Sequence, residues 1–184
     1  MKLNIGAGDS NYQDYIRIDY DPNTNPDYLV DLEKDSFPFE DNTVTRVIAH
    51  HILEHLGDGY FHCLKELYRV CSHGAIIDIR VPHPRHDSFL ADPTHKRPII
   101  PMGLKLFSKK FNQLSKEKGF ASSRLGDYYG VDFEIVEYKY VPDQDASEVL
   151  STMTQAELEV YANQHNNIIS EIQIKLVVVK DESQ

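Results

Sequence analysis

The sequence of 184 residues has no tryptophan, only two cysteines and no long apolar run. A membrane-spanning helix needs about 18 or more consecutive apolar residues, so we expect no membrane span. The first residues are too polar for a secretion signal, which predicts a cytoplasmic protein. Without a CxxC spacing, Cys63 and Cys71 are expected to be free, buried thiols rather than a disulfide or a zinc site.

Basic residues are also scarce, with 19 lysines and arginines against 29 acidic residues and a net charge of −10. Such a balance argues against nucleic acid or an anionic membrane as a partner. The charge is uneven, because residues 80–124 hold ten basic and three acidic residues. We therefore expect one local region that can bind an anion.

Apolar runs and turn residues alternate along the chain, which predicts strands and helices of an α/β fold with a mostly parallel sheet. Expected strands are residues 3–5, 15–19, a third ending near 29–31, 45–49, 75–81, 133–141 and 168–179. Helical spacing is found at 52–70, 103–119 and 147–164, the last with Ser147 as N-cap. No repeat or linker interrupts residues 1–184, so we expect a single domain.

A glycine turn, Gly6-Ala7-Gly8, directly follows the first predicted strand, where glycine lets the backbone approach a nucleotide closely. The dinucleotide fingerprint GxGxxG is not completed, because Asn11 takes the place of its third glycine. Asp19 ends the next strand, where a carboxylate can bind ribose hydroxyls. Asp31 and Leu32 follow the third strand, where they can contact an adenine. Each acid can also be an ordinary solvated loop carboxylate.

Several motifs of the first 81 residues together resemble the class I S-adenosylmethionine-dependent methyltransferases, in particular the methyltransferase type 11 group. These motifs are Leu3-Asn4-Ile5-Gly6-Ala7-Gly8, Ile18-Asp19-Tyr20-Asp21-Pro22, Asp31-Leu32, residues 37–44 (FPFEDNTV) and residues 50–56 (HHILEHL). The resemblance implies a Rossmann-like seven-stranded sheet that is mostly parallel, with an antiparallel last strand and helices on both faces.

The resemblance also implies S-adenosyl-L-methionine as cofactor and a set of residues around it. Gly6, Ala7 and Gly8 would flank its methionine part, Asp19 its ribose, Asp31 and Leu32 its adenine, and His50 with His51 its sulfonium side, with Tyr20 also among the cofactor-binding residues. Three departures from the family are expected: no N-terminal helices, a very short first connecting helix, and a final hairpin interrupted by residues 147–164. The first predicts an open cofactor site, which a homodimer partner or another subunit would cover.

The run His51-Ile52-Leu53-Glu54-His55 matches HxxEH, a zinc-protease signature in which two histidines bind zinc and the glutamate acts as base. The methyltransferase interpretation explains the same residues together with the upstream motifs, so no metal is expected. A metal-dependent hydrolase is kept as an alternative, with His51, Glu54 and His55, or with His83, His86 and His95, as ligands.

Residues 82–130 are expected to form an insertion on the acceptor side of the methyl-transfer site. His83 and His95 are predicted to be catalytic as proton acceptors, and Arg85, His86, Lys96 and Arg97 to bind the acceptor. Alternatively, this is a proline-ordered loop with ordinary hydrogen-bonding histidines. The sequence thus favours methyl transfer to oxygen or nitrogen of a small or glycan-like, anionic acceptor. A non-catalytic methyltransferase-like binding subunit is the second reading.

Overall fold

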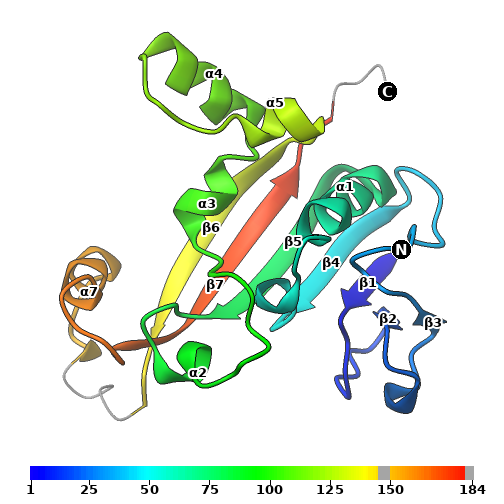
Figure 1. Cartoon of the computed structure of the whole chain (residues 1–184), viewed down its shortest axis with the longest axis horizontal. Coiled ribbons are helices and arrows are strands. Elements are labelled where there is room, and N and C mark those ends of the chain that lie inside the picture. Colours follow the sequence, from blue (N-terminus) through cyan, green and yellow to red (C-terminus); the bar gives the residue numbers. More distant parts are fainter. Residues whose placement is uncertain (145–149, 181–184) are drawn as a thin grey trace.

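The computed structural model describes residues 1–144 and 150–180, and its centre is one seven-stranded sheet (Figure 1). The strands are β1 (Lys2–Ile5), β2 (Ile16–Asp19), β3 (Tyr28–Leu29), β4 (Val44–His50), β5 (Cys71–Pro82), β6 (Phe133–Pro142) and β7 (Ile169–Val178). Their order is β3-β2-β1-β4-β5-β7-β6. Strand β7 runs antiparallel to β5 and β6, and the other pairs are parallel. The expected mostly parallel sheet with an antiparallel last strand is confirmed.

Short helices connect these strands. They are η1 (Pro22–Thr24), η2 (Leu53–His55), α1 (Tyr60–Val70), α2 (Asp87–Leu90), α3 (Pro101–Lys105), α4 (Lys109–Glu117), α5 (Leu125–Tyr129) and α7 (Gln155–Ala162). Within the described ranges, no helix is long and apolar enough to cross a membrane. Cys63 and Cys71 are free and buried, as expected.

The helix expected over residues 52–70 begins only at Tyr60, so this prediction is wrong for its first eight residues. His51 has a left-handed backbone, with φ of 54°, which ends β4 in a sharp turn before η2. Gly59 then passes so close to Glu33 that a Cβ at position 59 would lie 2.4 Å from the Cα and from the carbonyl oxygen of Glu33. Position 59 thus requires glycine, and the extended backbone of Leu56, with φ of −71° and ψ of 126°, separates η2 from α1, so no single helix runs from residue 52.

Two other helix boundaries differ from the sequence prediction because of local capping. Residues 103–119 form two helices, since the Ser108 hydroxyl accepts a hydrogen bond from the Phe111 N–H and caps α4 as a new helix. Helix α7 begins after Thr154, which forms a capping box with Glu157. Thr154 is thus the N-cap of α7; the predicted N-cap, Ser147, lies outside the described residues.

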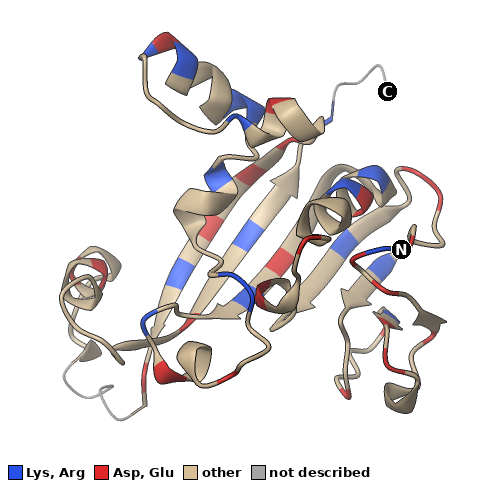
Figure 2. Ribbon diagram, in the orientation of Figure 1, with Lys and Arg blue, Asp and Glu red and all other residues tan. Residues whose placement is uncertain are grey.

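The sheet has one apolar face and one polar face. The apolar face is formed by Leu3, Ile5, Ile18, Val47, Ala49, Ile77, Ile79, Val81, Ile172, Ile174, Leu176 and Val178, all buried in the main core. Helices α1, α3 and α5 contribute to that core. The polar face carries Lys2, Asn4, Arg17, Arg46, His50, Asp78, Arg80, Glu137, Lys139, Gln173 and Lys175, as the strand pairing requires, and Figure 2 shows both charges along these strands.

Loops rather than helices lie over the polar face near β1 and β2. The Arg17 guanidinium donates to the carbonyl oxygens of Gly8 at 2.7 Å and Thr24 at 2.6 Å, and the Asn4 amide donates to the Ser10 carbonyl at 3.3 Å. Ile48 and Ile76, which also point to this face, are not part of the main core. Helices were expected on both faces of the sheet. Among the described residues, α1, α3 and α5 pack on the apolar face, because that face offers the apolar surface that a helix can bury.

An ion pair between the buried Glu66 and the half-buried Arg69 fixes the loop that precedes β4. Glu66 accepts the Phe37 N–H at 2.7 Å and pairs with Arg69 at 2.7 Å. Arg69 also donates to the carbonyl oxygens of Phe37 and Phe39, both at 2.9 Å. The Arg69 hydrogen bond is the largest cause that lowers the pKa of Glu66.

We expect Glu66→Gln to lower the free energy of unfolding by about 1–3 kcal/mol, because charge-assisted hydrogen bonds are lost. The folded-state pKa of Glu66 is lowered, so its stabilisation is present above the ordinary glutamate value of 4.5 and is lost as the pH falls below it. Urea denaturation of both proteins at pH 7 and pH 3.5 measures this. A gap between variant and wild type that is equally large at both pH values would contradict the assignment.

Arg97 joins the long segment after β5 to the start of α1. Its guanidinium donates to the carbonyl oxygen of Leu56 at 3.0 Å and to that of Gly57, and it lies 4.4 Å from the ring centroid of Tyr60. Tyr60 is buried and belongs to the main core. Arg97 therefore links two segments at the carboxyl edge of the sheet, the edge at which the parallel strands end.

Arg97→Met should lower the free energy of unfolding by about 1–3 kcal/mol, since two carbonyl groups lose a charged donor and Tyr60 loses its cation. Lys96→Met is the matched control, because the neighbouring Lys96 is exposed and its loss should leave the urea midpoint unchanged. Equal midpoints for the two variants would show that Arg97 has no bracing role.

Candidate functional site

The glycine turn after β1 has the backbone that its sequence predicts. Gly6 and Gly8 have φ of 58° and 49°, which favours glycine. A Cβ at Gly6 would lie 2.3 Å from Cγ1 of Ile52, so packing requires glycine there. A Cβ at Gly8 would meet nothing within 4 Å. Between them, Ala7 is buried, and the turn thus leaves an open backbone surface at Gly8.

Asp19 at the end of β2 holds this turn in place. Its Oδ2 accepts the Gly8 N–H at 2.8 Å and its Oδ1 accepts the Asp21 N–H at 2.9 Å. The residue is 6% exposed. A carboxylate has about four acceptor positions, so these two bonds do not exhaust it. Tyr20 beside it is 73% exposed.

The residues that follow β3 have different surroundings. Asp31 accepts a hydrogen bond from the Lys34 ammonium at 2.7 Å, and this bond is the largest cause that lowers its pKa. It also accepts the Glu33 N–H at 3.0 Å. Leu32 is 5% exposed and packs in the main core. Of this predicted pair, Asp31 lies at the surface and Leu32 inside.

His50 and His51 at the end of β4 bind different partners. His50 lies between the Tyr12 hydroxyl at 3.1 Å and the Asp78 carboxylate at 3.0 Å, on the polar face. His51 lies 2.9 Å from the Glu171 carboxylate and 3.6 Å from that of Glu54. These two carboxylates, Glu54 foremost, raise the pKa of His51.

His83, Arg85 and His86 form the turn that follows β5. Burial, with the charges of Arg85 and His86, lowers the pKa of His83 to about 4. Its Nδ1 accepts the Arg85 N–H at 3.3 Å. The Arg85 guanidinium donates to the carbonyl oxygens of Ala162 and Asn163 at the end of α7. His86 bonds to Asp143 at 3.0 Å and caps α2. Arg85 and His86 therefore hold the loop and its neighbours together.

The loop of His95, Lys96 and Arg97 returns to the turn after β4. The Glu54 carbonyl accepts the N–H of Lys96 at 2.7 Å and that of Arg97 at 3.2 Å. The ring centroids of His95 and His55 lie 4.6 Å apart. Lys96 is exposed, whereas the Arg97 side chain donates to the Leu56 carbonyl, as described above. This loop is thus placed beside the HxxEH run.

The basic stretch of residues 80–124 does not gather in one place. Helix α4, with Lys109, Lys110 and Lys116, lies beyond the arrowhead of β7, at the opposite end of the sheet from the arrowheads of β4 and β5 (Figure 1). Figure 2 shows basic residues as blue segments along the ribbon of α4. The α4 lysines are therefore remote from the carboxyl edge.

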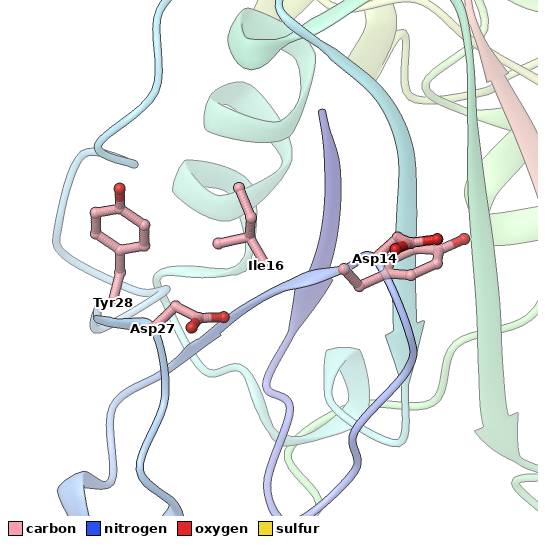
Figure 3. Close-up of a pocket in the computed structure, with 5 residues that line it drawn as sticks. Asp14, Ile16, Asp27 and Tyr28 are labelled. Atoms are coloured by element: carbon pink, nitrogen blue, oxygen red, sulfur yellow. The ribbon is translucent and has the colours of Figure 1, made fainter.

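A shallow hollow of about 690 Å³ lies beside the start of β2 and is lined by Asp14, Tyr15, Ile16, Asp27 and Tyr28. Figure 3 shows Ile16 and Tyr28 pointing the same way from neighbouring strands. The glycine turn does not line this hollow, so it is separate from the candidate cofactor site.

Two partners of the site histidines had no sequence signal. Asp78 meets His50 from β5, and Glu171 meets His51 from β7, across separations of 28 and 120 residues. In the sequence they are unremarkable charged residues at alternate positions of strands. Only the pairing of the strands brings them to the carboxyl edge.

No protein-family model matches the chain, and no curated protein matches its sequence. Solved structures do match: a SAM-dependent methyltransferase from Archaeoglobus fulgidus is 18% identical, with a TM-score of 0.64 over 96% of this chain and 85% of that one. The [4+2]-cyclase SpnF is 14% identical, with a TM-score of 0.57 over 98% and 75%. A putative methyltransferase in complex with the Haloferax volcanii activator Trm112 is 11% identical, with a TM-score of 0.54 over 98% and 82%.

The strand order, the antiparallel β7 and these matches agree on the architecture. A cyclase among the matches illustrates that one fold can carry more than one reaction. The chain has the fold of the class I S-adenosylmethionine-dependent methyltransferases.

Proposed function

We propose that this protein is a methyltransferase that binds S-adenosyl-L-methionine at the carboxyl ends of β1, β2 and β4. The observation that carries the proposal is the glycine turn, whose open backbone at Gly8 is fixed by Asp19. Ligands of open α/β sheets bind at the carboxyl ends of the strands, where the strand order reverses. Here that reversal lies between β1 and β4. The residues present therefore fit a nucleoside cofactor.

The cofactor would supply an electrophilic methyl group, and the chain would position the acceptor. Gly6, Ala7 and Gly8 would hold the methionine part, and Asp19 with its free acceptor positions would bind the ribose. Asp31 is proposed for the adenine, with Leu32 as part of the supporting core. Positioning of two reactants supplies much of the acceleration of such a transfer.

For proton removal from the acceptor, we propose His83 and His95. His83 is uncharged at neutral pH because its pKa is about 4, so it can accept a proton, although so low a pKa makes it a weak base. His51, beside two carboxylates, lies on the same edge of the sheet. The roles of His83 and His95 as proton acceptors are those that the sequence predicts.

The proposed acceptor is small or glycan-like, and anionic, with an oxygen or nitrogen nucleophile. Lys96 and Arg85 are both exposed cations of the acceptor loop, whereas Arg97 is half-buried. Arg85 and Arg97 already donate to backbone carbonyl groups, so they would shape the acceptor site from behind. So few accessible cations favour a small anion over a long polyanion.

Gly8→Ala tests the cofactor site, with Gly119→Ala as its matched control. Both glycines have positive φ, 49° and 68°, and in both cases a Cβ would meet nothing within 4 Å. Backbone strain is thus alike, on the order of 1–2 kcal/mol. We expect calorimetry with S-adenosylmethionine and S-adenosylhomocysteine to show at least about tenfold weaker binding, or about 1.4 kcal/mol, for Gly8→Ala alone. No binding by the wild type at millimolar ligand would refute the proposal.

A partner that covers the cofactor site, either a second copy or another subunit, is a second proposal. It is supported by the loops that replace helices over the polar face near β1 and β2. Sedimentation together with cofactor titration tests it. We expect a dimer, or a monomer that binds cofactor weakly until a partner is added. Full activity of a purified monomer would contradict it.

A further inference from the structure

Glu54, His55 and His95 meet at the carboxyl edge of the sheet, next to the predicted acceptor loop. One side-chain ligand atom from each lies within 4.8 Å of the others. Glu54 and His55 belong to η2, and His95 comes from a loop forty residues later along the chain. The two hydrogen bonds from the N–H groups of Lys96 and Arg97 to the Glu54 carbonyl hold this loop against η2. The three side chains are therefore brought together by a defined backbone contact.

The Glu54 carboxylate is unusual, because it is fully buried and neither oxygen accepts a hydrogen bond from any residue in the described ranges. The imidazole of His51 is 3.6 Å away, beyond hydrogen-bond distance, and its other nitrogen binds Glu171. A buried charge without hydrogen bonds is costly unless a counter-charge or a metal ion is beside it. His51 is the cationic group beside Glu54, but it leaves both carboxylate oxygens without a hydrogen bond, so Glu54 retains lone pairs for a further cation.

In the neutral form of each histidine, the hydrogen bond at Nδ1 leaves a lone pair on Nε2; Nε2 of His95 also lies 3.8 Å from the Asp92 carboxylate. The Thr94 hydroxyl donates to Asp92 at 2.6 Å, so at 2.8 Å from His55 it accepts the Nδ1–H. His95 Nδ1 lies 2.8 Å from the Phe89 carbonyl, which can only accept. Metal-binding histidines in proteins donate their second ring N–H in this way, and such bonds orient the ring.

We propose that Glu54, His55 and His95 form a binding site for a divalent transition-metal ion of the Zn²⁺ type. Two imidazole nitrogens and one carboxylate oxygen are a ligand set that such ions accept. A tetrahedral ion would keep one position open for water or for an oxygen of another ligand. Thr94 and the Phe89 carbonyl orient the ligands. The site rests on this geometry alone and does not depend on the proposed methyl transfer.

The proposal departs from the zinc-protease pattern that the sequence contains and from the expectation of no metal. In that pattern His51 would be a ligand, whereas in the structure His51 turns to Glu171. Its place is taken by His95, whose ring stacks on Phe89 at 5.1 Å. With His95 as a metal ligand, His83 would be the proton acceptor of the proposed methyl transfer.

The test is a Zn²⁺ titration of the metal-stripped protein by calorimetry, without S-adenosylmethionine, so that its result is independent of cofactor binding. We expect one ion per chain, and a loss of affinity of at least about tenfold in His55→Gln and in His95→Gln. The control is His165→Gln, because His165 contacts Tyr161 beside α7 and its loss should leave the affinity unchanged. No stoichiometric binding by the wild type, or equal affinities for all four proteins, would overturn the proposal.

Two further variants separate a metal site from a structural contact. Thr94→Val removes the bond that orients His55 and should weaken Zn²⁺ binding by about 10- to 100-fold. Glu54→Gln removes the buried charge, so its thermal midpoint without metal should equal or exceed that of the wild type, and the Zn²⁺-dependent rise should disappear. A lower midpoint of Glu54→Gln without metal, together with unchanged Zn²⁺ affinity, would show that Glu54 serves only the fold.

Discussion

The one-sided sheet is the constraint on which the rest of the molecule depends. Ile77, Ile79 and Val81 on β5 alternate with Asp78 and Arg80, and β7 has the same alternation. Parallel sheets are usually covered by helices on both faces. Here the main core lies on one face, and short loops suffice on the other. The connections that follow β1 and β2 are correspondingly short and hold no α-helix, and hydrogen bonds such as those of Asp19 and Arg17 fix them.

This architecture explains how the charged side chains of the carboxyl edge are used. A loop without a helix needs its backbone groups satisfied by side chains or by neighbouring loops. Arg17, Arg85 and Arg97 each donate to carbonyl groups of other segments, and Asp19 accepts N–H groups of the glycine turn. Charged residues that the sequence suggests as ligand-binding groups thus also hold the loops of the site together through hydrogen bonds to the backbone. The proposed proton-accepting and metal-binding roles therefore fall to histidines and to Glu54, which these contacts hold in place.

Much of this was predictable from local patterns, and the failures have physical causes. The strands and the left-handed glycines follow from periodicity and from motifs that specify backbone conformation, whereas the antiparallel β7 was implied by the family resemblance. The start of α1 did not, because the extended backbone at Leu56, which separates η2 from α1, has no signal in the helical spacing. The break before α4 depends on a serine cap within a helical pattern. The roles of Arg85 and Arg97 could not be foreseen, since both bind carbonyl groups that are distant in the sequence.

The sequence by itself determined the order of elements, the glycine turn and the acids at the strand ends, because these are encoded over short stretches by periodicity and backbone preference. Tertiary structure decided which side chains meet. His50 and His51 are adjacent in the chain, yet strand pairing gives Asp78 to one and Glu171 to the other. The packing of a distant loop on η2 joins His95, rather than His51, to Glu54 and His55. Such contacts arise from the sum of many packing interactions, which no local pattern records.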